Sequence, residues 1–173
     1  GRLPRDGAAA GPHLRRAFRR FVADRRIPRL EAGRGACDRG AHGRGLALAG
    51  AATRHIELAT GIALAFTRSP FVLSLEALDL DDISGGRTVI GLGAGVKRLN
   101  EDWHAVPQYD PPVTRMRETI AAIREIIASM AEGRDAQTAG TQVSVRVVGF
   151  RRPVSAVRSR IPIWLAAVLP GMA

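Results

Sequence analysis

Apolar and polar positions follow regular patterns only from about residue 45 onward. Residues 56–66 form an apolar, partly alternating run, typical of a strand that is buried on both faces toward its end. Ser69-Pro70 then combines an N-cap residue with proline at the first helical position, and apolar residues extend the predicted helix to about Ile83. The turn Ser84-Gly85-Gly86-Arg87 ends this helix.

A second strand is predicted at 88–93, about 32 residues after the first one begins. This spacing is the length of a βαβ unit with a right-handed crossover, so the two strands should be parallel. A longer helix is predicted between Asp110-Pro111-Pro112 and Gly133. Its apolar residues recur at steps of three and four, namely Val113, Met116, Ile120, Ile123, Ile127 and Met130. Such a stripe is typical of a core face, so we assign it no chemistry.

The last part of the chain adds two shorter patterns. Residues 143–148 indicate a short hairpin strand or an insertion, and 161–168 indicate a third buried strand, shortly before the chain ends at Ala173. Strand and helix therefore alternate, which predicts an α/β fold whose architecture is incomplete. We expect parallel strands near 56–62, 88–93 and 161–167, with helices near 70–83 and 113–131 packed outside them.

Residues 1–44, called the arm below, carry most of the charge. The chain has 26 Lys and Arg against 16 Asp and Glu, a net charge of +10, but 12 arginines and four acidic residues fall in the arm. The arm therefore contributes +8 and residues 45–173 only +2, so the charge does not point to a nucleic-acid partner for the body of the chain. Residues 31–44 lack periodicity and are expected to be loop or disordered.

One segment of the arm has helical spacing among its arginines. Its apolar residues are Leu14, Ala17, Phe18, Phe21 and Val22. The segment is either part of a solvated arm or a basic amphipathic helix on a membrane or a phosphate backbone. Arg15-Arg16-Ala17-Phe18 is similar to a twin-arginine export signal, but no apolar region follows it. We therefore reject export and expect a cytoplasmic protein.

The overall composition narrows the class of protein. With 173 residues, 46% of them hydrophobic and 24% charged, the default is one soluble globular domain, which we place at 45–173. The single cysteine excludes a disulfide framework and a cysteine-only zinc site. No apolar run approaches the roughly 18 to 20 residues of a spanning helix, so we expect no membrane partner.

Five sequence blocks occur in the order and spacing of one enzyme family. They are 54–66 with Arg68-Ser69-Pro70, 80–87, 91–95, 115–118 and 162–167. Residues 45–173 thereby resemble the luciferase-like flavin and deazaflavin oxidoreductases, the bacterial luciferase superfamily, whose closest-looking branch uses coenzyme F-420. The resemblance implies a TIM (β/α)8 barrel, which needs about 250 residues, so this chain would supply roughly the third to fifth strands. It also implies hydride transfer to, or oxygenation of, a small organic substrate by an enzyme that uses F-420 or alternatively FMN.

The resemblance further implies a cofactor site at the carboxyl ends of the strands. The flavin or deazaflavin ring is expected against Gly61 and Ile62, where the family has a bulge with a non-prolyl cis peptide bond, which costs about 3 kcal/mol. Lys97, Arg98 and Asn100 follow just outside the site. In the family a later turn holds the cofactor phosphate, and Leu169 stands here where relatives have glycine. The implied cofactor-binding residues are Gly61, Ile62, Gly93, Ala94, Gly95, Ala167, Val168, Leu169 and Pro170.

Other site interpretations are weaker. The glycines at 91, 93 and 95 suggest a dinucleotide fingerprint, but Val96 stands at the sixth position, where that motif needs glycine or alanine. His104 is a candidate proton donor, for which a surface-loop histidine is the simpler interpretation. Three candidate metal ligands lie isolated in the arm, Cys37, Asp38 and His42. With no acid partner at a diagnostic spacing, we name no catalytic residue.

The sequence therefore leaves three functional hypotheses. The leading one is a luciferase-like oxidoreductase. The second is a basic-arm protein that binds nucleic acid or an anionic surface. The third is a non-enzymatic remnant that forms a homodimer or aggregates through unclosed sheet edges. A shifted reading frame or a degenerate gene would explain the change of composition near residue 45. Because three strands cannot close a barrel, we expect this chain alone to bind its cofactor weakly or not at all and to show negligible turnover.

Overall fold

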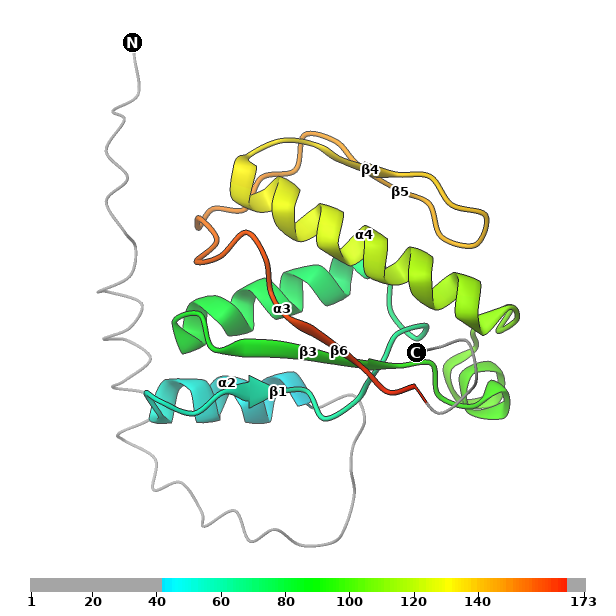
Figure 1. Ribbon diagram of the computed structural model, residues 1–173, viewed down its shortest axis with the longest axis horizontal. Helices are drawn as coiled ribbons and strands as arrows, with labels where there is room; N and C mark the ends of the chain where they lie inside the picture. Colours follow the sequence, from blue (N-terminus) through cyan, green and yellow to red (C-terminus); the bar gives the residue numbers. More distant parts are fainter. Residues whose placement is uncertain (1–41, 168–173) are drawn as a thin grey trace, which may run out of the picture. The chain divides into compact units, whose positions relative to one another are not determined.

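The computed structural model describes residues 42–167, in which strands and helices alternate (Figure 1). In chain order the elements are α2 (His42–Ala52), β1 (Leu58–Ala59), β2 (Ala63–Leu64), α3 (Pro70–Ser84), β3 (Thr88–Gly93), the π-helical turn η1 (Leu99–Trp103), α4 (Pro112–Glu132), β4 (Ala136–Thr138), β5 (Val145–Val147) and β6 (Ile163–Leu165). Strands β1, β2, β3 and β6 form one sheet in which every pairing is parallel. The α/β class and the parallel order of the three predicted strand regions are confirmed.

Strand β3 is the centre of this sheet. Its odd-numbered carbonyls face β1 and β2, and Ala65 N donates to Gly93 O at 3.0 Å. Its even-numbered groups face β6, where Ile90 N donates to the Pro162 carbonyl at 2.9 Å and Ala166 N donates to Leu92 O at 2.8 Å. All six residues of β3 are buried, which explains its nearly continuous apolar sequence.

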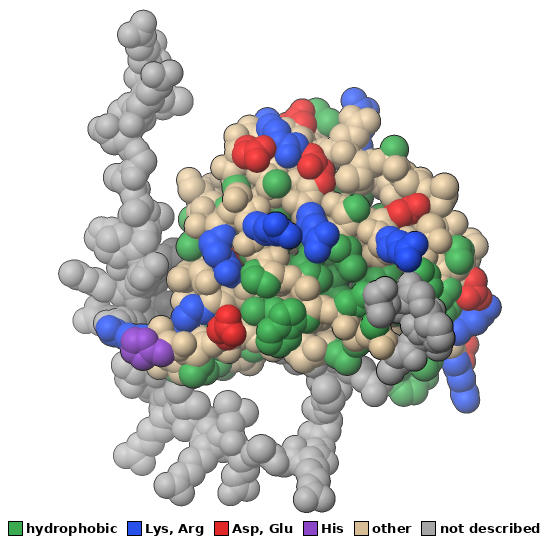
Figure 2. Space-filling view, in the orientation of Figure 1, with side chains coloured by type: hydrophobic (Ala, Val, Ile, Leu, Met, Phe, Trp, Pro, Cys, Tyr) green, Lys and Arg blue, Asp and Glu red, His purple; other side chains and the backbone are tan. Residues whose placement is uncertain are grey.

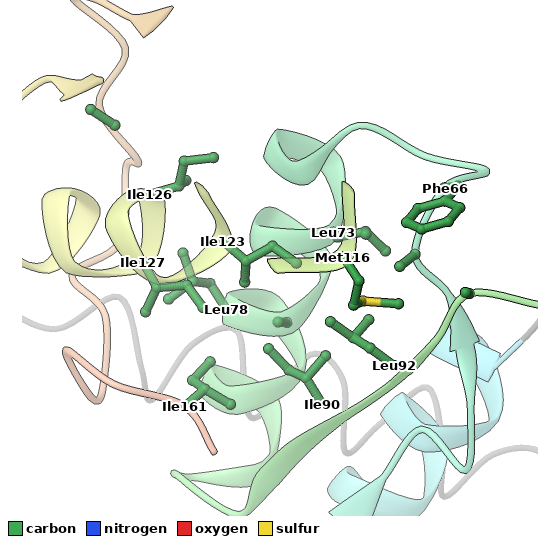
Figure 3. Packing of buried hydrophobic residues seen from close by; sticks show 14 of the residues in the cluster. Phe66, Leu73, Leu78, Ile90, Leu92, Met116, Ile123, Ile126, Ile127 and Ile161 are labelled. Atoms are coloured by element: carbon green, nitrogen blue, oxygen red, sulfur yellow. The ribbon is translucent and has the colours of Figure 1, made fainter. Parts of the chain in front are cut away.

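The core lies between one face of the sheet and helices α3 and α4 (Figure 3). The stripe predicted on α4 points into it: Met116, Ile123 and Ile127 are at most 2% exposed, and Ile120 is half-buried against the same cluster. The other side of the core consists of Leu73 and Leu78 on α3 and of residues on β3 and before β6, namely Ile90, Leu92 and Ile161. Burying this apolar surface is what holds the helices against the sheet.

The turn that ends α3 also fastens the preceding helix. Gly85 adopts a left-handed conformation (φ 72°), and Gly86 N donates to Asp81 O at 2.8 Å, which caps the helix. Arg87 then reaches across to the end of α2, where its guanidinium donates to the carbonyls of Gly50 and Thr53 at 3.0 and 2.9 Å. Ser84-Gly85-Gly86-Arg87 is therefore a structural clamp at the amino-terminal end of β3.

Antiparallel strands β4 and β5 form a hairpin beside α4, so the hairpin predicted from residues 143–148 is confirmed. The segment that follows is tied back to α3 by two arginines. Arg152 contacts Asp79 and Asp82 at 2.8 and 2.7 Å, and Arg158 forms a paired contact with the fully buried Asp81. Because a buried carboxylate needs a charged partner, Asp81 fixes the path of the chain before β6.

Helix α2 begins at His42, so the last three residues of the stretch expected to be irregular, 42–44, are helical instead. The many glycine and alanine residues of α2 give little contrast between an apolar and a polar face, which hides the helical pattern in the sequence. In the structure α2 packs on α3 and β1. Within residues 42–167 no helix is long and apolar enough to cross a membrane. The arm up to residue 41, with its expected amphipathic helix and basic surface, lies outside the described residues.

Candidate functional site

A bulge interrupts the first strand at the predicted ring position. Leu58 and Ala59 pair with Thr88 and Val89, whereas Ala63 and Leu64 pair with Leu92 and Gly93. Residues 60–62 thus lie opposite only 90–91, which means that one extra residue is inserted between β1 and β2. The bulge that the resemblance implied at Gly61 and Ile62 is present.

The side chain of Thr60 closes this bulge. Its hydroxyl accepts a hydrogen bond from Gly91 N at 2.8 Å and donates one to Gly91 O at 2.9 Å. Gly91 has no room for a side chain, because a Cβ atom there would lie 2.5 Å from the Gly61 carbonyl oxygen and 2.8 Å from that of Thr60. Thr60 and Gly91 therefore form one interlocked unit, in which the hydroxyl replaces the backbone pairing lost at the bulge.

The prediction of a cis peptide bond at the bulge is wrong. Among residues 42–167 the cis bond is Asp110–Pro111, and the bond between Gly61 and Ile62 is trans. The features that accompany the bulge are the extra residue and the two hydrogen bonds of the Thr60 hydroxyl.

The structure brings the glycine-rich turn directly beside the bulge. A Cβ atom at Gly93 would lie 2.6 Å from Cγ2 of Ile62, and one at Gly95 would lie 2.8 Å from Cδ2 of Leu64. Gly95 also has a φ of +68°, which a side chain rarely tolerates. Ile62, Gly93, Ala94 and Gly95, predicted separately, thus meet at the carboxyl edge of the sheet.

Two side chains hold the carbonyls of this turn. Asn100, fully buried, donates through Nδ2 to Ala94 O at 2.8 Å and to Val96 O at 3.0 Å, and the Tyr109 hydroxyl donates to Gly95 O at 2.8 Å. Burial, helped by the nearby Asp110 carboxylate, raises the pKa of Tyr109, so the hydroxyl stays a donor at neutral pH. Sequence reasoning placed Asn100 only near the site and missed Tyr109.

The two cations after the turn are engaged with acidic neighbours. Lys97 Nζ lies 2.7 Å from an Asp110 oxygen, and the hydrogen bond and charge of that carboxylate raise the pKa of Lys97. Arg98 pairs with Asp102 at 3.3 Å, and both side chains are largely exposed. These are ordinary surface ion pairs of small energetic weight.

The sheet face opposite the core, called the open face below, presents Ile62, Trp164 and Ala166, and the buried Gly93 lies beneath Ile62. Ile62 is 51% and Trp164 58% exposed, and the position of a Gly93 Cβ atom is 3.6 Å from the Ala166 Cβ, so β2, β3 and β6 meet here. Figure 2 shows apolar side chains gathered where Figure 1 draws β3 and β6. An apolar surface of this kind fits one side of a planar aromatic ring system.

The structure describes only some of the other predicted site residues. Ala167 is exposed at the end of β6, whereas Val168, Leu169 and Pro170 lie outside the described residues. His104 is exposed after η1, as expected of a surface histidine. Residues 42–167 contain no group of three or more potential metal-ligating side chains, and the Cys37, Asp38 and His42 side chains lie outside the description.

Comparison with known proteins gives one consistent result. Residues 45–173 match the family model described as luciferase-like monooxygenase. An uncharacterized protein of Mycobacterium tuberculosis is 38% identical over 88 residues, which are 51% of this chain and 26% of that protein. The 5,10-methylenetetrahydromethanopterin reductase of Archaeoglobus fulgidus is 32% identical over 126 residues, which are 69% of this chain and 33% of that enzyme.

The fold is shared as well. The solved structure of the coenzyme F-420-dependent tetrahydromethanopterin reductase from Methanopyrus kandleri superposes with a TM-score of 0.61 and 29% identity, covering 76% of this chain and 40% of that one. The chain therefore spans between about a quarter and two fifths of the length of these proteins.

Proposed function

The chain belongs to the luciferase-like monooxygenase family, and its fold is part of that family's TIM barrel, so we propose that it functions as an oxidoreductase that uses coenzyme F-420, or alternatively FMN. The reaction is hydride transfer to, or oxygenation of, a small organic substrate. The cofactor supplies the redox chemistry when bound, and the protein binds and orients it. The coenzyme F-420 dependence named for the Methanopyrus kandleri reductase favours F-420 over FMN.

The observation that carries this proposal is the bulge locked by Thr60 and Gly91. It directs Ile62 onto Gly93 at the carboxyl edge of a parallel sheet, the edge at which barrel enzymes bind their ligands. Ile62 and Trp164 offer exposed apolar surface for one side of the ring. Gly95 is exposed and lets a ligand approach the backbone of the turn, whereas the side chain of Ile62 fills the space beside Gly93.

The proposal has two further parts, one about the cofactor phosphate and one about the strength of binding. We assign the cofactor phosphate to the turn at 167–170, where Leu169 stands in place of the glycine expected there. We also propose weak binding by this chain alone, because the outer edges of β1, β2 and β6 have no partner strand among residues 42–167. A ring on the open face would then have one wall where a closed barrel provides several.

Fluorescence titration with F-420 and with FMN tests the proposal. The full chain should bind one of them weakly, and Gly93→Ala should weaken that binding further by pushing Ile62 out of place. Gly45→Ala is the matched control, because a Cβ atom there meets nothing within 4 Å. Equal affinities of the chain and Gly93→Ala for both cofactors would reject the site, and tight stoichiometric binding would reject the expected weakness.

A further inference from the structure

A hollow of about 370 Å³ lies at the carboxyl edge of the sheet but on its helix side, away from the open face. Its floor is formed by Ala65, Phe66 and Val106, which are at most 6% exposed. Figure 3 shows Phe66 at one end of the core, beyond Leu73 and Met116. The walls come from three separate places: the loop into α3, the segment 104–107, and the first two turns of α4 with the hairpin turn at 142–143.

The charged residues that line this hollow are all basic. Arg68 and Arg115 reach it from different elements, His104 completes the rim, and no aspartate or glutamate is among the lining residues. Two carboxylates contact lining residues, and both already have partners. Glu76 pairs with Arg68 at 2.6 Å, and both oxygens of Glu118 accept hydrogen bonds from residues 141–143 of the hairpin turn.

Two contacts fix the guanidinium of Arg115 at the hollow. Its guanidinium lies 4.8 Å from the centre of the Phe66 ring, a cation–π arrangement, and it donates one hydrogen bond to the Gln108 carbonyl. A guanidinium has five N–H groups in a rigid fork, so donors remain for a ligand. Because the side chain is half-buried, it loses little further freedom when an anion binds.

We propose that this hollow binds a small organic anion whose apolar body rests on Phe66 and Val106 and whose carboxylate or phosphate contacts Arg115 and Arg68. The volume is at the lower end of the roughly 300 to 1,000 Å³ of small-molecule sites, which fits a molecule built around a single ring. The site is distinct from the cofactor surface, because Ile62 and Trp164 lie on the opposite face of the sheet.

Calorimetric or NMR titration of the full chain tests the proposal with three probes of similar shape: sodium benzoate, phenyl phosphate and neutral benzamide. The two anions should bind and benzamide should not. Arg115→Gln should weaken anion binding about tenfold or more, since a charge-assisted hydrogen bond is lost. Arg124→Gln, an exposed position on the same helix outside the hollow, should leave it unchanged. Inorganic phosphate binding as tightly as phenyl phosphate would show that the apolar floor contributes nothing, which contradicts the proposal.

Two further measurements keep the outcome clear. If Arg115→Gln lowers the melting temperature strongly, Arg68→Gln provides a second variant, whose loss of anion binding should go in the same direction but be smaller, because Arg68 already pairs with Glu76. Neither variant should change the fluorescence titration with F-420 or FMN, so failure of the cofactor proposal and failure of this one are separable. Benzamide binding as tightly as benzoate, or unchanged benzoate affinity in both arginine variants, would overturn the anion site.

Discussion

Single atoms decide the geometry of the bulge. Gly91 faces two carbonyl oxygens at distances that no real Cβ atom tolerates, and Thr60 supplies the hydroxyl that satisfies both polar groups of Gly91. A glycine in a buried strand is usually interpreted as a weak point. Here it permits the close approach of a neighbouring strand, and the sequence alone does not distinguish the two cases.

Gly91→Ala should lower the free energy of unfolding by about 2 kcal/mol or more, because the added methyl group meets backbone that cannot move without breaking the sheet. Chemical denaturation followed by circular dichroism measures the change. Gly45→Ala, in the interior of α2, should instead be neutral or slightly stabilising. Equal stabilities for the two variants would contradict the close packing at the bulge.

Thr60→Val keeps the shape of the side chain and removes its hydroxyl. The Gly91 N–H then has no partner in the bulge, and we expect a loss of about 1 to 3 kcal/mol. Thr60→Ser retains the hydroxyl and should lose clearly less. Thermal unfolding of both variants checks the order, and a serine variant as unstable as the valine variant would show that packing rather than the hydrogen bonds matters.

At the scale of elements, the accuracy of sequence-based prediction follows the strength of the local signal. Helix α4 was predicted within about one residue of its ends, because its stripe of methionine and isoleucine repeats regularly between proline and glycine signals. Helix α2 was missed because its glycine and alanine residues give little amphipathic contrast. Strand β4 was missed because three residues between a helix and a loop show no alternation.

Sequence reasoning likewise predicted some residues of the candidate site and missed others. Gly61, Ile62 and the glycine turn came from the resemblance, and the structure brings them together. Tyr109 was not foreseen, because the contact that matters joins its hydroxyl to a carbonyl fourteen residues earlier in the chain. The available signal was that Tyr109 is the single tyrosine in the sequence.

The hairpin is held to α4 by one carboxylate. Glu118 accepts hydrogen bonds from the backbone N–H groups of 141, 142 and 143 and from the Thr141 hydroxyl. Burial alone would raise the pKa of Glu118, but these hydrogen bonds outweigh it and lower the pKa to about 2. The ionised carboxylate is therefore the form that holds the turn.

Because the folded-state pKa lies below the ordinary value of 4.5, this contribution to stability is present above about pH 4.5 and is lost as the pH falls toward 2. Hydrogen exchange should show weakening protection of residues 141–143 across that window, with α4 unaffected. Glu118→Gln should show the same loss at neutral pH. Protection that is independent of pH in the unmodified chain would contradict the anchoring role of the carboxylate.

At the scale of the whole molecule, the four described strands leave two sheet edges and one apolar face without partners among residues 42–167. Unpaired edges of a parallel sheet expose backbone groups that a closed barrel satisfies. The same strands carry the bulge, the glycine turn and the open face to which we assign the cofactor ring. The proposed ring surface and the strands that would enclose it are thus separate parts of the family's fold.

Joining this chain to the remaining strands of a family reductase should therefore restore cofactor binding, because the added strands pair the open edges and enclose the ring on the open face. The measurement is the F-420 and FMN fluorescence titration of the fusion beside that of the unmodified chain. Leu169→Gly in the unmodified chain should not restore binding, since one turn cannot replace the absent walls. Recovery of binding by Leu169→Gly alone would show that the phosphate turn limits affinity, whereas a folded fusion that binds neither cofactor would reject the assignment of the bulge as the ring site.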